Sequence, residues 1–158
     1  MPHAAPLVLH RATVLPEWVD YNGHMNEAYY VLVFGHATDA FYGYIGLDDA
    51  TRRATARSVY TLEAHINYLN EAHRGDRLTI ATQLLAHDAK RLHLHHAMRR
   101  QGDAGLLATT ELMLLHVDMS GPRAAAFGAA TAALVAAIAA DHAGLGKPEH
   151  VGHVIGIR

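Results

Sequence analysis

The amino-acid sequence predicts an α+β fold in which an antiparallel sheet wraps around one long helix. The first observation is a segment, residues 26–45, whose apolar residues recur at spacings of three and four, as in a helix that packs on a core. The second is a series of four later segments that are rich in strand-forming residues and are separated by short turns. The simplest packing of one long helix and one antiparallel sheet folds the sheet around the helix.

The predicted elements follow in the order β-α-β-β-β-β-α. Residues 7–15 form the first strand, which Pro16 ends, and Gly46 lies where a glycine would end the first helix. Residues 48–57 form a polar connection. The next four strands span residues 58–70, 77–87, 91–99 and 106–118. An alanine-rich helix over residues 122–142 follows, and residues 147–158 are expected to be extended.

Length and composition limit the possible functions. The chain has 158 residues, so we expect a single domain over residues 1–158. Its net charge of −2 gives no chain-wide basic surface for nucleic acid or for an anionic membrane. The absence of cysteine excludes disulfides, Cys-ligated metals and a thiol nucleophile. The first residues lack the basic region of a signal peptide, and no apolar helical stretch reaches about 20 residues, so we expect a cytoplasmic protein.

A short loop before the first helix carries the most chemical information. It places a carboxylate (Asp20), a glycine (Gly23), an imidazole (His24) and an amide (Asn26) beside a helix N-terminus. The unpaired N–H groups there carry a partial positive charge and stabilise an oxyanion that forms on a carbonyl. Asp20 would then act as a nucleophile or as a general base on water. The alternative is structural: Asp20 and Asn22 form a turn, and Asn26 caps the helix.

The pattern Asp20-x-x-Gly23-His24-Met25-Asn26-x-x-Tyr29-Tyr30 resembles the D-x-x-G signature of hotdog acyl-CoA thioesterases of the 4-hydroxybenzoyl-CoA type. The segments 63–69 and 75–76 resemble the second strand of that family and its following turn. The resemblance implies a hotdog fold: a five-stranded antiparallel sheet around a long central helix, here with an extra C-terminal helix. It implies that Asp20 is catalytic and that the N–H of Gly23 polarises the thioester carbonyl. It also implies a homodimer or a dimer of dimers, with no cofactor or metal.

Four longer strings are similar to betainyl-CoA thioesterases of bacterial carnitine degradation: PEWVDYNGHMNEAYY, VFGHATDAF, VYTLEAHI and TQLLAHDAKRLHLHH. This resemblance implies hydrolysis of betainyl-CoA to glycine betaine and CoA. The chain departs from that family at residues 26–29 and at His95 or His96, close to the expected site. Another short or aromatic acyl-CoA is therefore the alternative substrate, and a non-catalytic acyl-CoA-binding module is the alternative function.

A trimethylammonium group is bound by aromatic faces through cation–π attraction. Trp18, Tyr21 and Tyr60 are the best candidates for such a cage, and Tyr30 is a fourth. The alternative for one tyrosine of the pair Tyr29 and Tyr30, as for Phe34 and Phe41, is ordinary packing in the helix core.

Strict alternation in residues 58–70 predicts Leu62, Ala64, Ile66 and Tyr68 on one face and Thr61, Glu63, His65 and Asn67 on the other. Glu63 and His65 would orient water or the ammonium group, unless that face is solvated or contacts another subunit. In a dimer across the site, Tyr60 and Glu63 would serve the Asp20 of the partner.

Four further sets of residues are considered for a function. Lys90 and Arg91 would pair with the phosphates of CoA, or would protect a strand edge. His24 would hydrogen-bond to the thioester or to Asp20. The negative charge of Glu27 is expected only to interact favourably with the dipole of the helix that it begins. His93 and His95 share a strand face, but no third ligand is indicated, so no metal site is expected. A hydratase would resemble a D-x4-H pattern, which the spacing of Asp20 and His24 does not fit.

Overall fold

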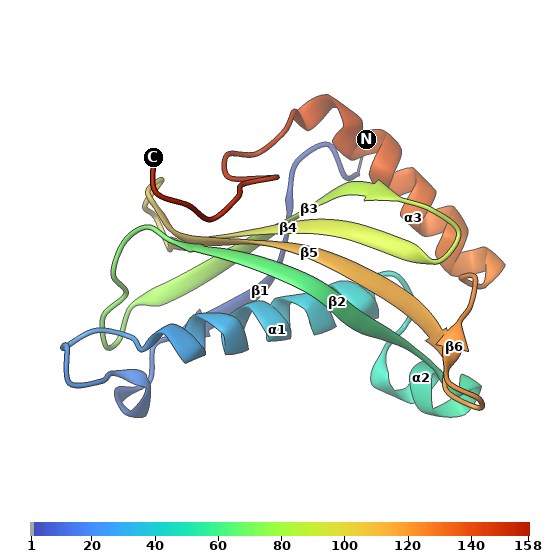
Figure 1. Ribbon diagram of the computed structural model, residues 1–158, viewed down its shortest axis with the longest axis horizontal. Helices are drawn as coiled ribbons and strands as arrows, with labels where there is room; N and C mark the ends of the chain where they lie inside the picture. Colours follow the sequence, from blue (N-terminus) through green and yellow to red (C-terminus); the bar gives the residue numbers. More distant parts are fainter. Residues whose placement is uncertain (1) are drawn as a thin grey trace.

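The computed structural model describes residues 2–158 (Figure 1). Its strands are β1 (Leu7–Thr13), β2 (Arg57–Tyr68), β3 (Arg77–His87), β4 (Arg91–Arg100), β5 (Leu106–Asp118) and β6 (Arg123–Ala124). Its α-helices are α1 (Glu27–Tyr44), α2 (Asp49–Thr55) and α3 (Ala129–His142), and the short 3-10 helices are η1 (Pro16–Trp18) and η2 (Ala143–Leu145).

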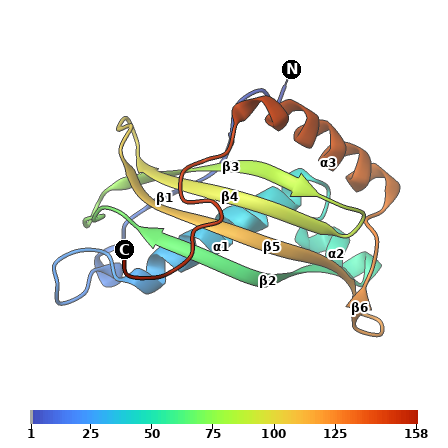
Figure 2. The same ribbon diagram turned by 45° about the horizontal axis from the view of Figure 1, so that its top comes forward.

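The strands form one antiparallel sheet in the order β1-β3-β4-β5-β2, with β6 paired to the end of β5. The sheet curls around α1, while α3 and the C-terminal tail cover its opposite, outer face (Figures 1 and 2). The predicted α+β hotdog architecture, with a central helix and an extra C-terminal helix, is confirmed. No helix in the described part of the chain is long and apolar enough to span a membrane.

The core lies between α1 and the inner face of the sheet. Phe41 and Ile45 pack with Leu92, Leu94 and Leu114 toward the end of α1. Toward its start, other residues of α1 form a second cluster with β3 and β4: Tyr30, Val33, Phe34, Leu78, Ile80 and Met98. Phe34 and Phe41 are buried, so the prediction that they are core residues is confirmed. The core therefore fixes the N-terminus of α1 against the sheet.

Two segments differ from the sequence-based prediction. Residues 48–57 contain α2, which Asp48 caps by accepting a hydrogen bond from the N–H of Thr51 (2.8 Å). This helix has no buried residue, so it leaves no apolar periodicity in the sequence. The predicted helix over residues 122–142 begins only at Ala129, because Arg123 and Ala124 pair with β5.

The edge strand β2 contains a bulge. Thr61 pairs with Leu114 and Glu63 with Met113, so Leu62 has no partner on β5. The extra residue shifts the alternation, and Thr61 faces the α1 side together with Ala64 and Ile66. The prediction that Thr61 shares a face with Glu63 is therefore wrong. The exposed large apolar side chains of this strand include Tyr60, Leu62 and Tyr68.

Candidate active site

The loop that precedes α1, residues 19–25, is closed by its own backbone. Val19 and Met25 form an antiparallel bridge, and the N–H of Asp20 donates to the carbonyl of His24 (3.2 Å). The N–H of Gly23 donates to the carbonyl of Asp20 (3.0 Å). Gly23 has a φ of +83°, a left-handed conformation that glycine adopts without strain. This Asp20 loop holds a carboxylate directly before the start of α1.

Both oxygens of the Asp20 carboxylate accept hydrogen bonds. Oδ1 accepts from the N–H of Asn22 (2.8 Å), and Oδ2 accepts from Nδ2 of Asn26 (2.9 Å). These two donors, the Asn26 amide first, lower the pKa of Asp20 from its ordinary value. Asp20 is therefore an ionised carboxylate at neutral pH, the form that a nucleophile or a general base requires.

Asn26 also caps α1, because its Oδ1 accepts from the N–H of Ala28 (3.0 Å). The turn at Asp20 and the helix cap at Asn26, which the sequence offered as an alternative to a catalytic role, are therefore both present. They do not exclude that role, because the same residues also form the polar site around the Asp20 carboxylate. The structure does not support the expectation that the N–H of Gly23 polarises the thioester carbonyl. This N–H donates to a carbonyl inside the turn and does not face outward as a donor. Among the described residues, the N–H of Glu27, the first residue of α1, has no acceptor.

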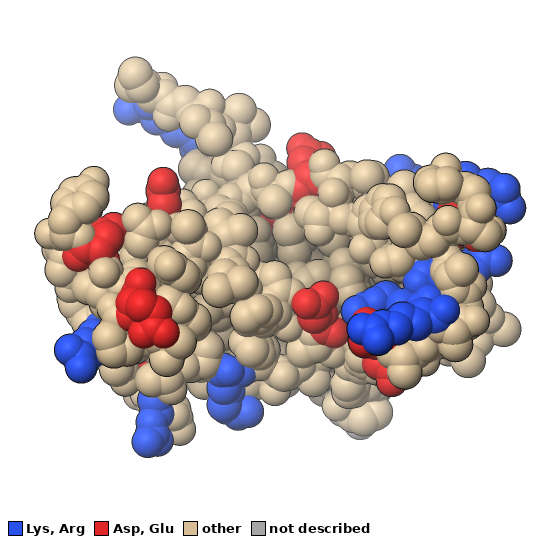
Figure 3. Space-filling model, turned by 90° about the horizontal axis from the view of Figure 1, so that it is seen from below, with Lys and Arg blue, Asp and Glu red and all other residues tan. Residues whose placement is uncertain are grey.

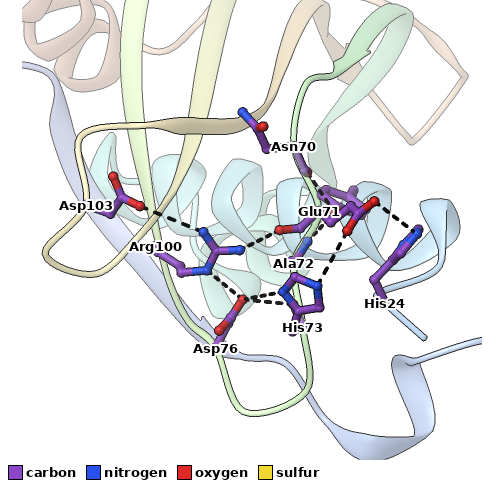
Figure 4. A network of polar contacts seen from close by, with 9 residues as sticks. His24, Asn70, Glu71, Ala72, His73, Asp76, Arg100 and Asp103 are labelled. Atoms are coloured by element: carbon purple, nitrogen blue, oxygen red, sulfur yellow. Dashed lines mark hydrogen bonds and ion pairs between the residues drawn. The ribbon is translucent and has the colours of Figure 1, made fainter. Parts of the chain in front are cut away.

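The opposite wall of the site is the loop after β2, residues 69–76 (Figure 4). The hydroxyl of Tyr30 accepts from the N–H of Ala72 (3.0 Å) and donates to the carbonyl of Asn70 (3.3 Å). The carbonyl of Ala72 accepts from the N–H of Met25 (2.8 Å). Arg100 donates to the carbonyl of Glu71 and, through Nε, to Oδ2 of Asp76 (2.7 Å). This loop is therefore tied to the Asp20 loop, to α1 and to β4.

An open pocket of about 370 Å³ lies between the two loops. Its lining combines three carboxylates with three tyrosines and carries no Lys or Arg: Asp20, Tyr21, Asn22, His24, Met25, Asn26, Glu27, Tyr30, Tyr68, Leu69, Asn70 and Glu71. Sequence reasoning missed Tyr68 and Glu71. Their only local signal is their place at the end of a predicted strand and just after it.

The pocket brings together most of the residues predicted around Asp20. Tyr21 and Tyr30 line it, and Tyr30 is also buried, so its packing and its lining role coexist. Nε2 of His24 lies 3.7 Å from Oε1 of Glu71, and the described donors to the Asp20 carboxylate are Asn22 and Asn26, not His24. Trp18 stacks on Tyr29, with ring centroids 5.4 Å apart, and is not among the lining residues.

The other residues that were predicted for the site lie outside this pocket. Tyr60 lies near the start of β2 and Glu63 at its middle, whereas the pocket is at its end. The ring of His65 packs on that of His153 in the C-terminal tail (5.8 Å), on the outer face of the sheet. His65 is therefore not brought to Asp20, because its register position points it away from α1.

Lys90, in the turn after β3, and Arg91, the first residue of β4, lie at the opposite end of the sheet from the Asp20 loop (Figure 1). Nε of Arg91 donates to Oδ2 of Asp88 (2.7 Å). On the α1 side of the molecule, further Lys and Arg side chains gather at the end that carries α2 (Figure 3). Arg52 and Arg53 lie in the last turn of that helix.

The histidines do not form a ligating cluster. Nε2 of His93 contacts Oε1 of Glu111 (2.7 Å), and burial lowers the pKa of His95 to about 4. Within residues 2–158, no group of three His, Asp or Glu side chains is placed to hold a metal ion.

The fold and the motif together define a class of protein. Residues 14–135 match the thioesterase-like superfamily, and the chain belongs to that family. It is 51% identical over 151 residues to the betainyl-CoA thioesterase of Pseudomonas aeruginosa, covering 96% of this chain and 95% of that protein. It is 44% identical over 149 residues to an L-carnitine dehydrogenase/betainyl-CoA thioesterase of Ruegeria pomeroyi, but spans only 30% of that longer protein.

Solved structures agree with this assignment. A Pseudomonas putida protein superposes with a TM-score of 0.84 at 39% identity, covering 97% of both chains. A Staphylococcus aureus protein in complex with CoA superposes with a TM-score of 0.90 at 30% identity, covering 98% of both chains. The family resemblance found in the sequence is confirmed.

Proposed function

We propose that this protein is a thioester hydrolase that cleaves betainyl-CoA to glycine betaine and CoA. The observation that carries the proposal is the position of the Asp20 carboxylate just before the N-terminus of α1. Two hydrogen bonds to this carboxylate stabilise its ionised form. The near-full-length similarity to a protein named betainyl-CoA thioesterase supports the choice of substrate.

The site can supply both parts of the reaction. The thioester oxygen would accept a hydrogen bond from the N–H of Glu27 at the N-terminus of α1, which stabilises the charge that develops on attack. Asp20 either attacks the carbonyl carbon or removes a proton from an attacking water. In the first route the C–S bond breaks as an anhydride forms between Asp20 and the acyl group, and water then cleaves this anhydride and restores the carboxylate. In the second route water attacks the acyl carbon directly, and the C–S bond breaks. In both routes a proton from water goes to the thiolate of CoA. CoA thiolate is a good leaving group, so no acid is required.

A homodimer would complete this site. The free edge of β2 carries exposed apolar side chains, and an unpaired edge is a template for pairing with a second strand. Two β2 strands that pair antiparallel around a two-fold axis bring the start of one strand beside the end of the other. Tyr60 and Glu63 of a second copy would then approach the pocket. The basic end of that copy, with Lys90 and Arg91 further along it, would face the CoA phosphates. We place this assembly in the cytoplasm.

The test is release of free thiol from betainyl-CoA, acetyl-CoA, butyryl-CoA and benzoyl-CoA. The chain has no cysteine, so the protein adds no thiol background. We expect betainyl-CoA to be the best substrate and Asp20→Asn to lower kcat about 10²–10⁴-fold. Asp141→Asn, in α3 on the outer face of the sheet (Figure 1), is the matched control and should retain the wild-type rate.

Each other outcome removes one part of the proposal. Faster hydrolysis of a neutral thioester would refute the betainyl substrate. Full activity of Asp20→Asn would refute the role of Asp20. No hydrolysis of any thioester would refute the reaction itself.

A further inference from the structure

The backbone around Glu71 is fixed by hydrogen bonds to neighbouring segments. Arg100 donates to the carbonyl of Glu71 (Figure 4). The hydroxyl of Tyr30 accepts from the N–H of Ala72, and the N–H of Met25 donates to its carbonyl. Within residues 2–158, no donor makes a hydrogen bond to the Glu71 side chain. Its oxygens lie 3.7 Å from Nε2 of His24 and 3.5 Å from Nε2 of His73, which are ion-pair distances for a protonated imidazole, but neither contact is a hydrogen bond.

The other acidic groups nearby are already engaged or stabilised. Both oxygens of Asp20 accept hydrogen bonds, and Asp76 accepts from Arg100 and from the N–H of His73. Glu27 lies in the first turn of α1, where the helix N-terminus stabilises its charge. Glu71 projects from the opposite wall of the pocket, and its carboxylate accepts no hydrogen bond from the described residues. The cationic groups that contact it are the imidazoles of His24 and His73, which pair with it only when they are protonated.

The acyl group of betainyl-CoA carries its charge close to the reacting carbon. A single methylene separates the quaternary nitrogen from the thioester carbonyl, so any group that recognises this charge must line the same pocket as Asp20. A quaternary ammonium has no N–H and makes no conventional hydrogen bond. It is held by an anion and by aromatic faces. Glu71, Tyr68 and Tyr21 supply these in the pocket.

We propose that Glu71 is the residue that makes this site select a cationic acyl group over a neutral one of the same shape. The inference rests on the proposed function, because it assigns a role within that reaction. Tyr68 supports the same role: it meets Tyr30 edge-to-face, with ring centroids 5.3 Å apart, and so is held as one wall of the pocket. Glu71 acts on the ammonium group, whereas Asp20 acts on the carbonyl.

The experiment compares two thioesters that differ only in charge. Betainyl-CoA and 3,3-dimethylbutyryl-CoA have the same branched shape, with N⁺ in one and carbon in the other. Both carry the same CoA, so the ratio of their kcat/KM values reports recognition of the acyl charge alone. We expect Glu71→Gln to lower this ratio about tenfold or more, chiefly by raising KM for betainyl-CoA. Glu71→Asp should recover part of the ratio.

Two further variants keep the test specific. Glu149→Gln removes an exposed carboxylate from the C-terminal tail and should leave the ratio at its wild-type value. Glu27→Gln tests the other carboxylate of the pocket that accepts no hydrogen bond from the described residues. Glu71 is exposed and the variant keeps its shape, so it should melt at the wild-type temperature.

A ratio that is unchanged in Glu71→Gln, or that falls only in Glu27→Gln, would overturn the inference. A wild-type ratio near one would also overturn it, while the thioesterase activity would stand. If the wild type hydrolyses neither thioester, the proposed function fails, and the inference fails with it.

Discussion

The side chain of Asn26 joins the Asp20 loop to α1. Its Nδ2 donates to Oδ2 of Asp20 at 2.9 Å, while its Oδ1 accepts from the first turn of the helix. One residue therefore fixes both the carboxylate and the helix N-terminus toward which the thioester carbonyl would point. Separating these two roles is the most direct test of the site.

Asn26→Asp should separate them. Aspartate keeps the oxygen that caps α1, so the free energy of unfolding should change little. It loses the donor to Asp20 and places a second carboxylate beside it, which raises the pKa of Asp20. The wild type should lose activity only as pH falls through the lowered pKa of Asp20. The acid limb of the kcat/KM profile should therefore move to higher pH in the variant.

Asn26→Ala is the companion variant. It removes the cap as well and should cost about 1 kcal/mol of stability. Identical acid limbs in the wild type and Asn26→Asp would show that Asp20 is not the group that titrates.

Tyr30→Phe should loosen the wall that carries Glu71. The hydroxyl of Tyr30 is the acceptor for the N–H of Ala72, which is completely buried. Leaving that N–H without a partner costs about 1–3 kcal/mol, measurable by urea denaturation. KM for betainyl-CoA should rise as well.

Tyr29→Phe is the matched control, since its ring stacks on Trp18 and its hydroxyl makes no hydrogen bond within residues 2–158. Equal free energies of unfolding of the two variants would contradict the inference that the Tyr30 hydroxyl stabilises the loop after β2.

His96 should make stability depend on pH. It is buried between Thr38 and Thr82, whose hydroxyls lie 2.9 Å from its two ring nitrogens. Burial lowers its pKa to about 3, with His95 and His10 adding positive potential when protonated. The unfolded chain binds this proton below about pH 6.5, whereas the folded protein does not. The free energy of unfolding should therefore fall as pH falls from about 6.5, by about 1.4 kcal/mol per pH unit for each such histidine.

His96→Gln removes this histidine. The slope of the free energy of unfolding against pH should decrease by the contribution of one proton. The measurement is urea denaturation at several pH values between about 5 and 7.5, the range in which a histidine in the unfolded chain titrates. His87→Gln, at the exposed end of β3, is the control and should keep the wild-type slope. An unchanged slope in His96→Gln would mean that this histidine does not remain neutral in the fold.

Leu62→Lys should dissociate the proposed dimer. Leu62 is unpaired at the bulge of the β2 edge and 56% exposed, so a lysine there is compatible with the folded protomer but not with a second strand. Sedimentation should show monomers, and kcat/KM should fall because the partner side of the pocket is lost. Val8→Lys, on β1 at the opposite edge of the sheet, should leave the assembly intact. A dimeric Leu62→Lys variant would exclude this edge as the interface.

The sequence was sufficient for those features that neighbouring residues determine. The spacing of apolar residues predicted α1 to within one residue at each end, with Asn26 and Ile45 as its flanking residues. The same holds for the Asp20 turn, since its glycine, asparagine and aspartate specify a turn locally. The short polar helix α2 and the bulge at Leu62 were not predictable, because neither leaves a local periodicity.

The sequence by itself therefore determined the α+β class, the order of the elements and the identity of the loop that holds Asp20. Only the tertiary structure decided what stands opposite that loop. Tyr68 and Glu71 lie more than forty residues further along the chain, and they reach the pocket because Arg100, Tyr30 and Met25 bind the loop between β2 and β3. The structure also moved His65 to the outer face and engaged the N–H of Gly23 inside its turn. Such contacts depend on strand register and on packing between distant segments, which local residue patterns do not encode.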